Sequence, residues 1–204
     1  MPERYSQHTE SSRLRAVSLA PHPGTPSTAV RTIDVRLCRA TGGTLTVKYV
    51  LEADLDRLRV PTPRPPRIAD RLWEHTCFEI FVRRQGVPGY HEFNLAPSGE
   101  WAAYAFERYR AGTPLMDEAL NPQITVRVRR DPRRGPVATG KLELDALIRL
   151  ESLSPMYAHA DLALALSAVV EERGGARSYW ALEHPDGKPD FHHPDAFALQ
   201  LTNA

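Results

Sequence analysis

Apolar and polar residues alternate with a period of two along most of the chain, which is the pattern of strands that bury one face. Two such runs, residues 30–39 and 45–51, flank Gly42 and Gly43 and predict a β-hairpin. Similar runs continue almost to the C-terminus, and the turns between them are rich in Pro and Gly. About ten or eleven short strands are predicted, which indicates an all-β fold, an antiparallel β-sandwich with one or two short helices.

Two segments have a less decisive pattern. Residues 161–170 are almost entirely apolar and rich in Ala and Leu, which favour helices. Because this segment is short and lies among strands, we predict a buried strand there. Asp145, followed by Ala-Leu-Ile, predicts a one-turn helix that the aspartate caps.

Residues 72–82 form the stretch around which the rest of the chain is organised. Read as a strand, this stretch has one face that becomes apolar after its first residues, as at Phe78. The opposite face combines an indole, an imidazole and a carboxylate, from Trp73, His75 and Glu79. A buried core rarely contains this mixture, and a solvated face rarely contains Trp. The mixed face therefore predicts a binding surface.

The next predicted strand, residues 90–95, extends this surface. If its apolar side joins the core, Tyr90, Glu92 and Asn94 lie on the mixed face. Aromatic rings beside planar hydrogen-bonding groups suit sugars, which stack their C–H faces on rings and hydrogen-bond through their hydroxyls. The alternative is that loops or the second sheet cover this face and that its polar groups are structural.

A second unusual segment, residues 178–195, crowds aromatic and histidine side chains into a Pro-rich loop. Trp180, His184 and His192 are candidate ligand contacts, because loops often carry binding sites. The alternative is that the segment caps one end of the sandwich and that Tyr179 or Trp180 plugs the core.

Motifs for metal binding and catalysis are weak. His192 and His193 lie near Asp190, but their spacing matches no zinc signature, and we predict no metal site. Glu79 and Glu92 could form an acid/base pair, although the sequence fixes neither their separation nor their pKa values. We expect a non-catalytic module that binds a small molecule rather than an enzyme.

Composition excludes several partners and compartments. A formal net charge of +1 provides no field that would recruit nucleic acid. No run of about 18 apolar residues is present, so the sequence predicts no membrane span. The polar start, Met-Pro-Glu-Arg-Tyr-Ser-Gln-His, lacks the apolar segment of a secretory signal, and we expect a cytoplasmic protein.

The length of 204 residues suits one large β domain. Residues 1–11 are polar and are predicted to be a flexible segment, and residues 12–204 are predicted to form a single sandwich. Cys38 and Cys77 lie in predicted strands, and in a reducing compartment we expect both thiols to be free.

Three stretches, residues 72–82, 90–101 and 189–197, resemble the bacterial DOMON-like proteins. This family is related to the family 9 carbohydrate-binding modules and to the haem-binding DOMON domains. The resemblance covers roughly residues 12–202 and implies a β-sandwich that binds a sugar or haem.

Carried over residue by residue, the Trp-x5-Glu spacing of the sugar-binding modules falls on Trp73 and Glu79, and their second aromatic plate falls on Trp180. Two positions depart from that pattern, because Thr76 replaces an acidic residue and Glu92 replaces a basic one.

The haem relatives use a Met with a His or Lys as axial ligands, and no Met of this chain lies in a matching motif. The candidate ligands for haem iron are Met116, Met156, His75, His159 and His184. A sugar-like ligand without a cofactor is the leading hypothesis. Haem is the alternative, and a protein-interaction domain without a small ligand is a third.

Overall fold

The computed structural model describes residues 14–40, 42–131 and 139–203, so the predicted flexible segment at residues 1–11 lies outside the described residues. Within the described residues the regular structure consists of strands and short 3-10 helices, without an α-helix. The strands are β1 (Arg15–Pro21), β2 (Val30–Arg39), β3 (Thr44–Ala53), β4 (Cys77–Arg84), β5 (Tyr90–Leu95), β6 (Trp101–Arg108), β7 (Ala111–Pro114), β8 (Gln123–Asp131), β9 (Thr139–Arg149), β10 (Leu162–Glu171), β11 (Arg177–Ala181) and β12 (Leu199–Leu201). The 3-10 helices are η1 (Leu72–Glu74), η2 (Glu118–Leu120), η3 (Leu150–Ser152), η4 (Pro155–Ala158) and η5 (Pro194–Ala196).

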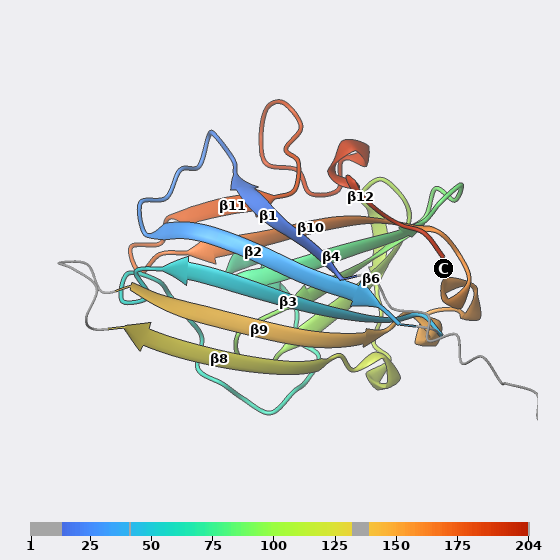
Figure 1. Cartoon of the computed structure of the whole chain (residues 1–204), viewed down its shortest axis with the longest axis horizontal. Helices are drawn as coiled ribbons and strands as arrows, with labels where there is room; N and C mark the ends of the chain where they lie inside the picture. Colours follow the sequence, from blue (N-terminus) through green and yellow to red (C-terminus); the bar gives the residue numbers. More distant parts are fainter. Residues whose placement is uncertain (1–13, 41, 132–138, 204) are drawn as a thin grey trace, which may run out of the picture.

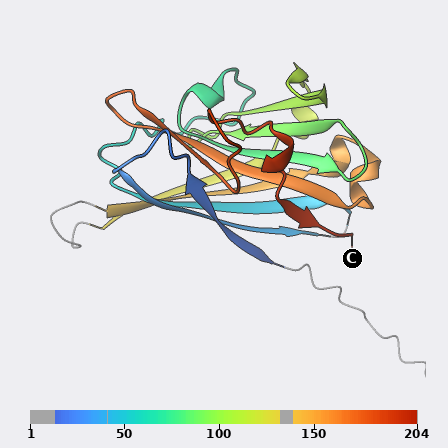
Figure 2. The same ribbon diagram turned by 90° about the horizontal axis from the view of Figure 1, so that it is seen from above.

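The strands form two stacked layers, as the views in Figure 1 and Figure 2 show. The first layer has the order β8-β9-β3-β2-β1, and the second has the order β7-β6-β5-β4-β10-β11. β12 pairs with the first residues of β10. All of these strand pairs are antiparallel, so the predicted all-β antiparallel sandwich is confirmed.

Strand β1 connects the two layers along one edge. Its residues Arg15 to Leu19 pair with β2 in the first layer, and Ala20 and Pro21 pair with β11 in the second. One strand that is shared between two sheets protects part of an edge that would otherwise expose unpaired backbone groups.

The main core lies between the layers and consists of the alternating apolar residues of both inner faces. Phe78 of β4 is fully buried there and lies 4.9 Å from the ring of Tyr49 of β3, measured between ring centroids. The Tyr49 hydroxyl donates a 2.8 Å hydrogen bond to the backbone oxygen of Glu79, which ties the layers together. Glu79 itself, the neighbour of Phe78, must point to the opposite, outer face of the second layer.

The β2–β3 hairpin forms as predicted, with Gly42 and Gly43 at φ values of 88° and 91°. These left-handed conformations favour glycine. A Cβ on Gly43 would also lie 3.1 Å from the Cα of Ala158, so this turn packs closely against η4.

Strand β10 confirms the prediction of a buried strand at residues 161–170. It is buried along its whole length because the first layer covers one of its faces and C-terminal residues cover part of the other. Burial on both faces explains why its apolar run shows no alternation.

Two local predictions are wrong. Asp145 does not cap a helix, because β9 continues to Arg149. Its side chain instead forms a 2.9 Å ion pair with Arg127. The strand expected at residues 72–82 begins only at Cys77. Before it, Leu72 packs onto the outer face of the second layer, and the chain turns through η1.

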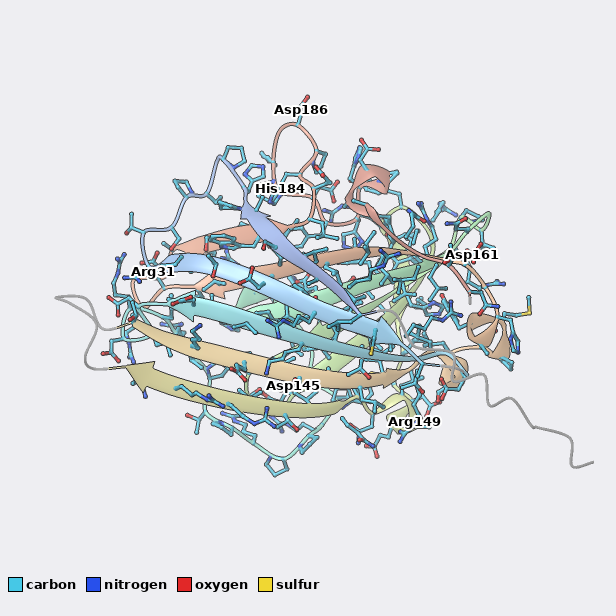
Figure 3. The ribbon with its side chains drawn as sticks, in the orientation of Figure 1. Arg31, Asp145, Arg149, Asp161, His184 and Asp186 are labelled. Carbon is cyan, nitrogen blue, oxygen red and sulfur yellow. The ribbon has the colours of Figure 1, made fainter. Side chains whose placement is uncertain are left out.

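The outer face of the first layer carries many charged side chains, and Figure 3 shows Asp145 and Arg149 among them. A 2.7 Å ion pair joins Lys48 to Glu143 across β3 and β9 on this face. Such pairs are typical of a solvated sheet surface and contribute little stability. In the described part of the chain, no helix is long and apolar enough to cross a membrane. Cys38 and Cys77 are both free, as predicted.

Candidate functional site

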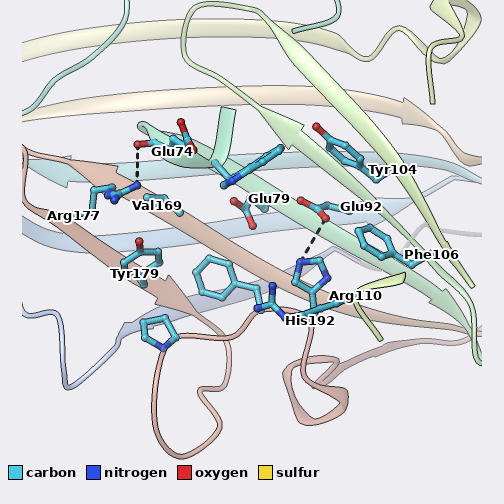
Figure 4. A pocket seen from close by; sticks show the side chains of 13 residues that line it. Glu74, Glu79, Glu92, Tyr104, Phe106, Arg110, Val169, Arg177, Tyr179 and His192 are labelled. Carbon is cyan, nitrogen blue, oxygen red and sulfur yellow. Dashed lines mark hydrogen bonds and ion pairs between the residues drawn. The ribbon is translucent and has the colours of Figure 1, made fainter. Parts of the chain in front are cut away.

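The outer face of the second layer holds a pocket of about 410 Å³, which we call the outer pocket. Two segments that are distant in sequence flank it, the turn around η1 and the C-terminal segment at residues 189–197. Its lining comes from five neighbouring strands, β6, β5, β4, β10 and β11, from these two segments, and from Arg110 in the turn between β6 and β7 (Figure 4). The volume lies in the range of small-ligand sites.

Two carboxyl groups lie on the floor of the outer pocket. Glu79 of β4 and Glu92 of β5 line it, although their exposed fractions are only 3% and 5%. In the strand register Glu79 faces Asn94, and Glu92 lies two positions before Asn94 on the same face. Their carboxylates therefore point into the same space, as Figure 4 shows.

Aromatic side chains form the walls. Trp73 of η1 is 39% exposed and lies edge-to-face with Tyr104 of β6, with their ring centroids 5.8 Å apart. Phe106, two positions along β6, also lines the pocket. Tyr179 of β11 and Phe191 line the opposite side, with their ring centroids 6.0 Å apart. The rings come from both the sheet and the flanking segments, so a ligand would contact aromatic surface on several sides.

A network of hydrogen bonds fixes His192 over this floor. The backbone N–H of Arg110 donates to the Tyr90 hydroxyl at 3.2 Å, and the same hydroxyl is hydrogen-bonded to Nδ1 of His192 at 3.0 Å. The Nε2 atom of His192 lies 3.8 Å from Oε2 of Glu92. Asp190 accepts from the backbone N–H of His192 at 3.1 Å and from Arg110 at 2.8 Å, which holds the loop against β6.

Burial changes the acidity of all three central groups. Burial, and next the charge of Glu92, raises the pKa of Glu79 well above its ordinary value. Burial also raises the pKa of Glu92 to about 7, although a hydrogen bond from Asn94 and the charge of Arg110 oppose this shift. Burial, and next the charge of Arg110, lowers the pKa of His192 to about 4. Below about pH 7 the free pocket therefore holds protons on both carboxyl groups and, above about pH 4, a neutral imidazole.

Two buried polar atoms on this floor lack partners. Among the described residues, Oε1 of Glu79 and the hydroxyl of Ser167 have no hydrogen-bond partner. The two residues face each other across β4 and β10, and the Ser167 hydroxyl lies near enough to lower the pKa of Glu79, although the two side chains do not meet hydrogen-bond geometry. Buried polar groups are nearly always hydrogen-bonded, so an unpartnered carboxyl oxygen in a pocket indicates a place for a ligand or water.

The rim carries charges that are largely engaged with each other. Arg71 forms a 2.6 Å ion pair with Glu74, and Arg177 donates at 3.3 Å to the backbone oxygen of Glu74. Arg110 pairs with Asp190 at 2.8 Å. These arginines can still reach a ligand's outer atoms, because the side chains of Arg110 and Arg177 line the pocket.

The structure brings six of the nine predicted site residues together. Trp73, Glu79, Glu92 and His192 line the outer pocket. Tyr90 and Asn94 lie behind this lining, where Tyr90 orients His192 and Asn94 donates a 2.7 Å hydrogen bond to Oε1 of Glu92. These two act as supporting residues.

The other three lie elsewhere. His75 pairs with Glu171 at 2.8 Å, outside the pocket, because the strand alternation does not extend back to it. Trp180 is buried in the core between the layers, the alternative that the sequence left open. His184 donates a 2.9 Å hydrogen bond from Nε2 to the backbone oxygen of Ala20 and does not line the pocket.

Sequence reasoning missed several lining residues. Those it did not single out are Glu74, Tyr104, Phe106, Arg110, Val169, Arg177, Pro189 and Phe191. Tyr104 and Phe106 could have been found by continuing the alternation onto the third strand of the meander, where Tyr104 faces Glu92. From the sequence, Tyr179 is considered only as a candidate to fill the core. In the structure it lies on the pocket side of β11, because its neighbour Trp180 points inward.

Metal and haem sites can be judged from the residues present. In the part of the chain that the structure describes, no group of three or more His, Cys, Asp or Glu residues could hold a metal ion. Met116 and Met156 are 71% and 59% exposed and do not line the outer pocket. The pocket's histidine, His192, already engages Tyr90. The residues therefore do not fit a Met/His axial pair for haem.

Comparison with models of protein families finds no match, and comparison with curated proteins finds none either. Among solved structures, the chain is similar to a protein from Bacteroides uniformis that is described as a "putative carbohydrate-binding protein". The TM-score is 0.60 with 14% sequence identity, over 90% of this chain and 83% of that chain. At this identity the likeness shows that the two chains share a fold.

Proposed function

We propose that the protein is a non-catalytic binding module and that it holds a carbohydrate-like ligand in the outer pocket. The observation that carries this proposal is the unpartnered Oε1 atom of Glu79 at the floor of a pocket with aromatic walls. A sugar ring can stack on Trp73 or Tyr179 while its hydroxyls bond to the floor carboxyls. The description of the structural neighbour and the resemblance to DOMON-like proteins support the same ligand class.

The arrangement favours binding over hydrolysis. A retaining glycosidase needs one ionised carboxylate as its nucleophile beside a protonated general acid. Here burial raises the pKa values of both Glu79 and Glu92, so below about pH 7 both carboxyl groups hold protons and neither serves as the ionised nucleophile. The neutral His192 beside Glu92 adds no positive charge that would ionise it.

A screen of ligand classes separates the competing functions. The purified protein is heated with simple sugars, oligosaccharides, nucleotide sugars and haem, and its unfolding temperature is recorded. A rise with saccharides supports the proposal, because a ligand that binds only the folded state stabilises it. A rise in the unfolding temperature with haem alone, together with a Soret band, would favour a haem protein. No response to any compound would favour a protein-interaction domain.

Replacing Trp73 with alanine should weaken the binding of any saccharide found in the screen about thirtyfold. A stacking aromatic at a binding hot spot contributes about 2 kcal/mol, and about 1.4 kcal/mol corresponds to tenfold in affinity. Isothermal titration calorimetry on the wild type and the variant measures this change.

Met116→Ala is the control for this prediction, because Met116 is an exposed apolar side chain outside the outer pocket. This variant should bind as the wild type does. An unchanged affinity in Trp73→Ala would show that the saccharide binds elsewhere.

A further inference from the structure

In the described part of the chain, the two acidic groups on the floor of the outer pocket lack a Lys or Arg partner at ion-pair distance, although the charge of Arg110 acts to lower the pKa of Glu92. Among the described residues, neither Glu79 nor Glu92 forms an ion pair with a Lys or Arg. The contacts of Glu92 are the amide of Asn94 at 2.7 Å and the imidazole of His192 at 3.8 Å. Buried carboxyl groups are rarely left without a partner, because burying an uncompensated charge is costly.

We propose that the ligand of the outer pocket carries a positively charged amino group, as an amino sugar does, and that this group binds between Glu79 and Glu92. This inference rests on the proposed function and narrows its ligand class. The unpartnered Oε1 of Glu79, on a side chain with only 3% of its surface exposed, marks the position where the amino group would donate.

The aromatic walls favour the same ligand. The faces of Trp and Tyr rings attract cations, most strongly where water is excluded. Trp73, Tyr104 and Tyr179 surround the space above the two carboxyl groups. A neutral sugar would use the rings only for stacking, whereas a cation would interact with both the rings and the carboxylates.

The rim arginines do not substitute for this cation. Arg110 is held by Asp190 at 2.8 Å and by the hydroxyl of Tyr109 at 3.2 Å. Arg177 donates at 3.3 Å to the backbone at Glu74. Each is tied to the rim, while the carboxyl groups lie on the floor beneath.

Binding of a cation should displace protons from the floor. In the free protein the raised pKa of Glu79 keeps a proton on it at neutral pH, and the raised pKa of Glu92 keeps a proton on it below about pH 7. An ammonium group favours the ionised carboxylates, so its binding releases protons to the solvent.

Other groups around the pair affect this titration and must be considered with it. The titratable, charged and polar groups around the carboxyl pair on the outer face are Cys77, Tyr90, Asn94, Tyr104, Arg110, Ser167 and His192, and those at the rim are Glu74, Arg177 and Tyr179. Tyr49 lies on the inner side of the sheet and contacts only the backbone of Glu79, and burial raises its pKa well above its ordinary value. The pKa of His192 is lowered to about 4, and burial raises those of Cys77 and Tyr104. Between about pH 6 and 8 the protons released therefore come from the carboxyl pair.

The test compares glucosamine, a cation, with N-acetylglucosamine and glucose, which are neutral. Calorimetry at pH 6.5 in two buffers with different ionisation enthalpies gives the affinity and the number of protons released. We expect glucosamine to bind at least about tenfold more tightly than either neutral sugar, with net proton release. Glu92→Gln should abolish most of this preference. Glu143→Gln, on the outer face of the first layer and outside the outer pocket, should retain it.

The outcomes separate this inference from the proposed function. If a neutral sugar binds as tightly as glucosamine and no protons are released, the inference fails but the proposed function stands. If none of the three sugars nor any other saccharide binds, both fail. Because the wild type alone gives the preference and the proton count, the inference remains falsifiable even if the Gln variant folds poorly.

Discussion

Replacing Phe78 with alanine should lower the free energy of unfolding by about 3–5 kcal/mol. Phe78 is fully buried between the two layers and contacts the ring of Tyr49 in the opposite sheet. Removal of its ring leaves a cavity in the middle of the core, which the surrounding strands can only partly fill. Urea denaturation of the wild type and the variant measures the loss.

Trp73→Ala is the matched control for this experiment. Trp73 is 39% exposed and lies on the opposite side of the second layer from Phe78, so its truncation should change stability much less. Equal losses in the two variants, or a larger loss in Trp73→Ala, would show that the assignment of inner and outer faces is inverted.

Glu92→Gln should stabilise the protein at pH 8 and have little effect at pH 5. The pKa of Glu92 is raised from 4.5 to about 7 by burial, so the folded protein holds this proton more tightly than the unfolded chain does. The stability from this group is fully present below about pH 4.5 and is lost as the pH rises through about 7. At about 1.4 kcal/mol for each pKa unit, Gln should gain up to about 3 kcal/mol at pH 8.

The titration of His192 changes the stability in the opposite direction with pH, because its pKa is lowered. The variant must therefore be compared with the wild type at each pH. The pKa of His192 is lowered from 6.5 to about 4, and its contribution to stability is lost as the pH falls through this range. Urea denaturation at pH 5, 6.5 and 8 gives the three differences. Gln retains an oxygen that can accept the hydrogen bond from Asn94, so this contact should persist.

Glu100→Gln is the control for the Glu92 prediction, because the two carboxyl groups have opposite shifts. Partial burial acts to raise the pKa of Glu100, but hydrogen bonds from Arg67 and Ser98 outweigh it and lower that pKa. Glu100→Gln should therefore lose stability at pH 8 rather than gain it. A loss of stability at pH 8 in Glu92→Gln as well would contradict the electrostatics derived for the pocket floor.

The sequence predicts the floor of the pocket better than its walls. The alternation in β4 and β5 is regular, so the faces of Glu79, Glu92 and Asn94 follow directly from the position of Phe78. Trp73 belongs to a 3-10 turn, where strand alternation gives no orientation, and it reaches the pocket through the packing of Leu72. Its place depends on tertiary contacts that periodicity does not encode.

The β11 residues show a second limit. Tyr179 and Trp180 are adjacent aromatic residues, and either could face the core in a strand of only five residues. The pairing of β11 with β10 sets the register, which places Trp180 inward beside Ala168 and Tyr179 outward beside Val169. The turn at residues 172–176 joins the two strands of this pair, and nothing in the composition of β11 determines which ring turns inward.

The central claim, that a saccharide binds in the outer pocket, is tested most directly by the indole N–H signals of the three tryptophans in a ¹⁵N-labelled sample. Trp73 lines the pocket, whereas Trp101 and Trp180 are buried in the core. Trp73→Phe identifies the Trp73 signal. On titration with a saccharide from the screen, that signal should shift saturably while the other two stay in place. Saturable binding by calorimetry without movement of the Trp73 signal, or with movement of the Trp180 signal instead, would contradict the account.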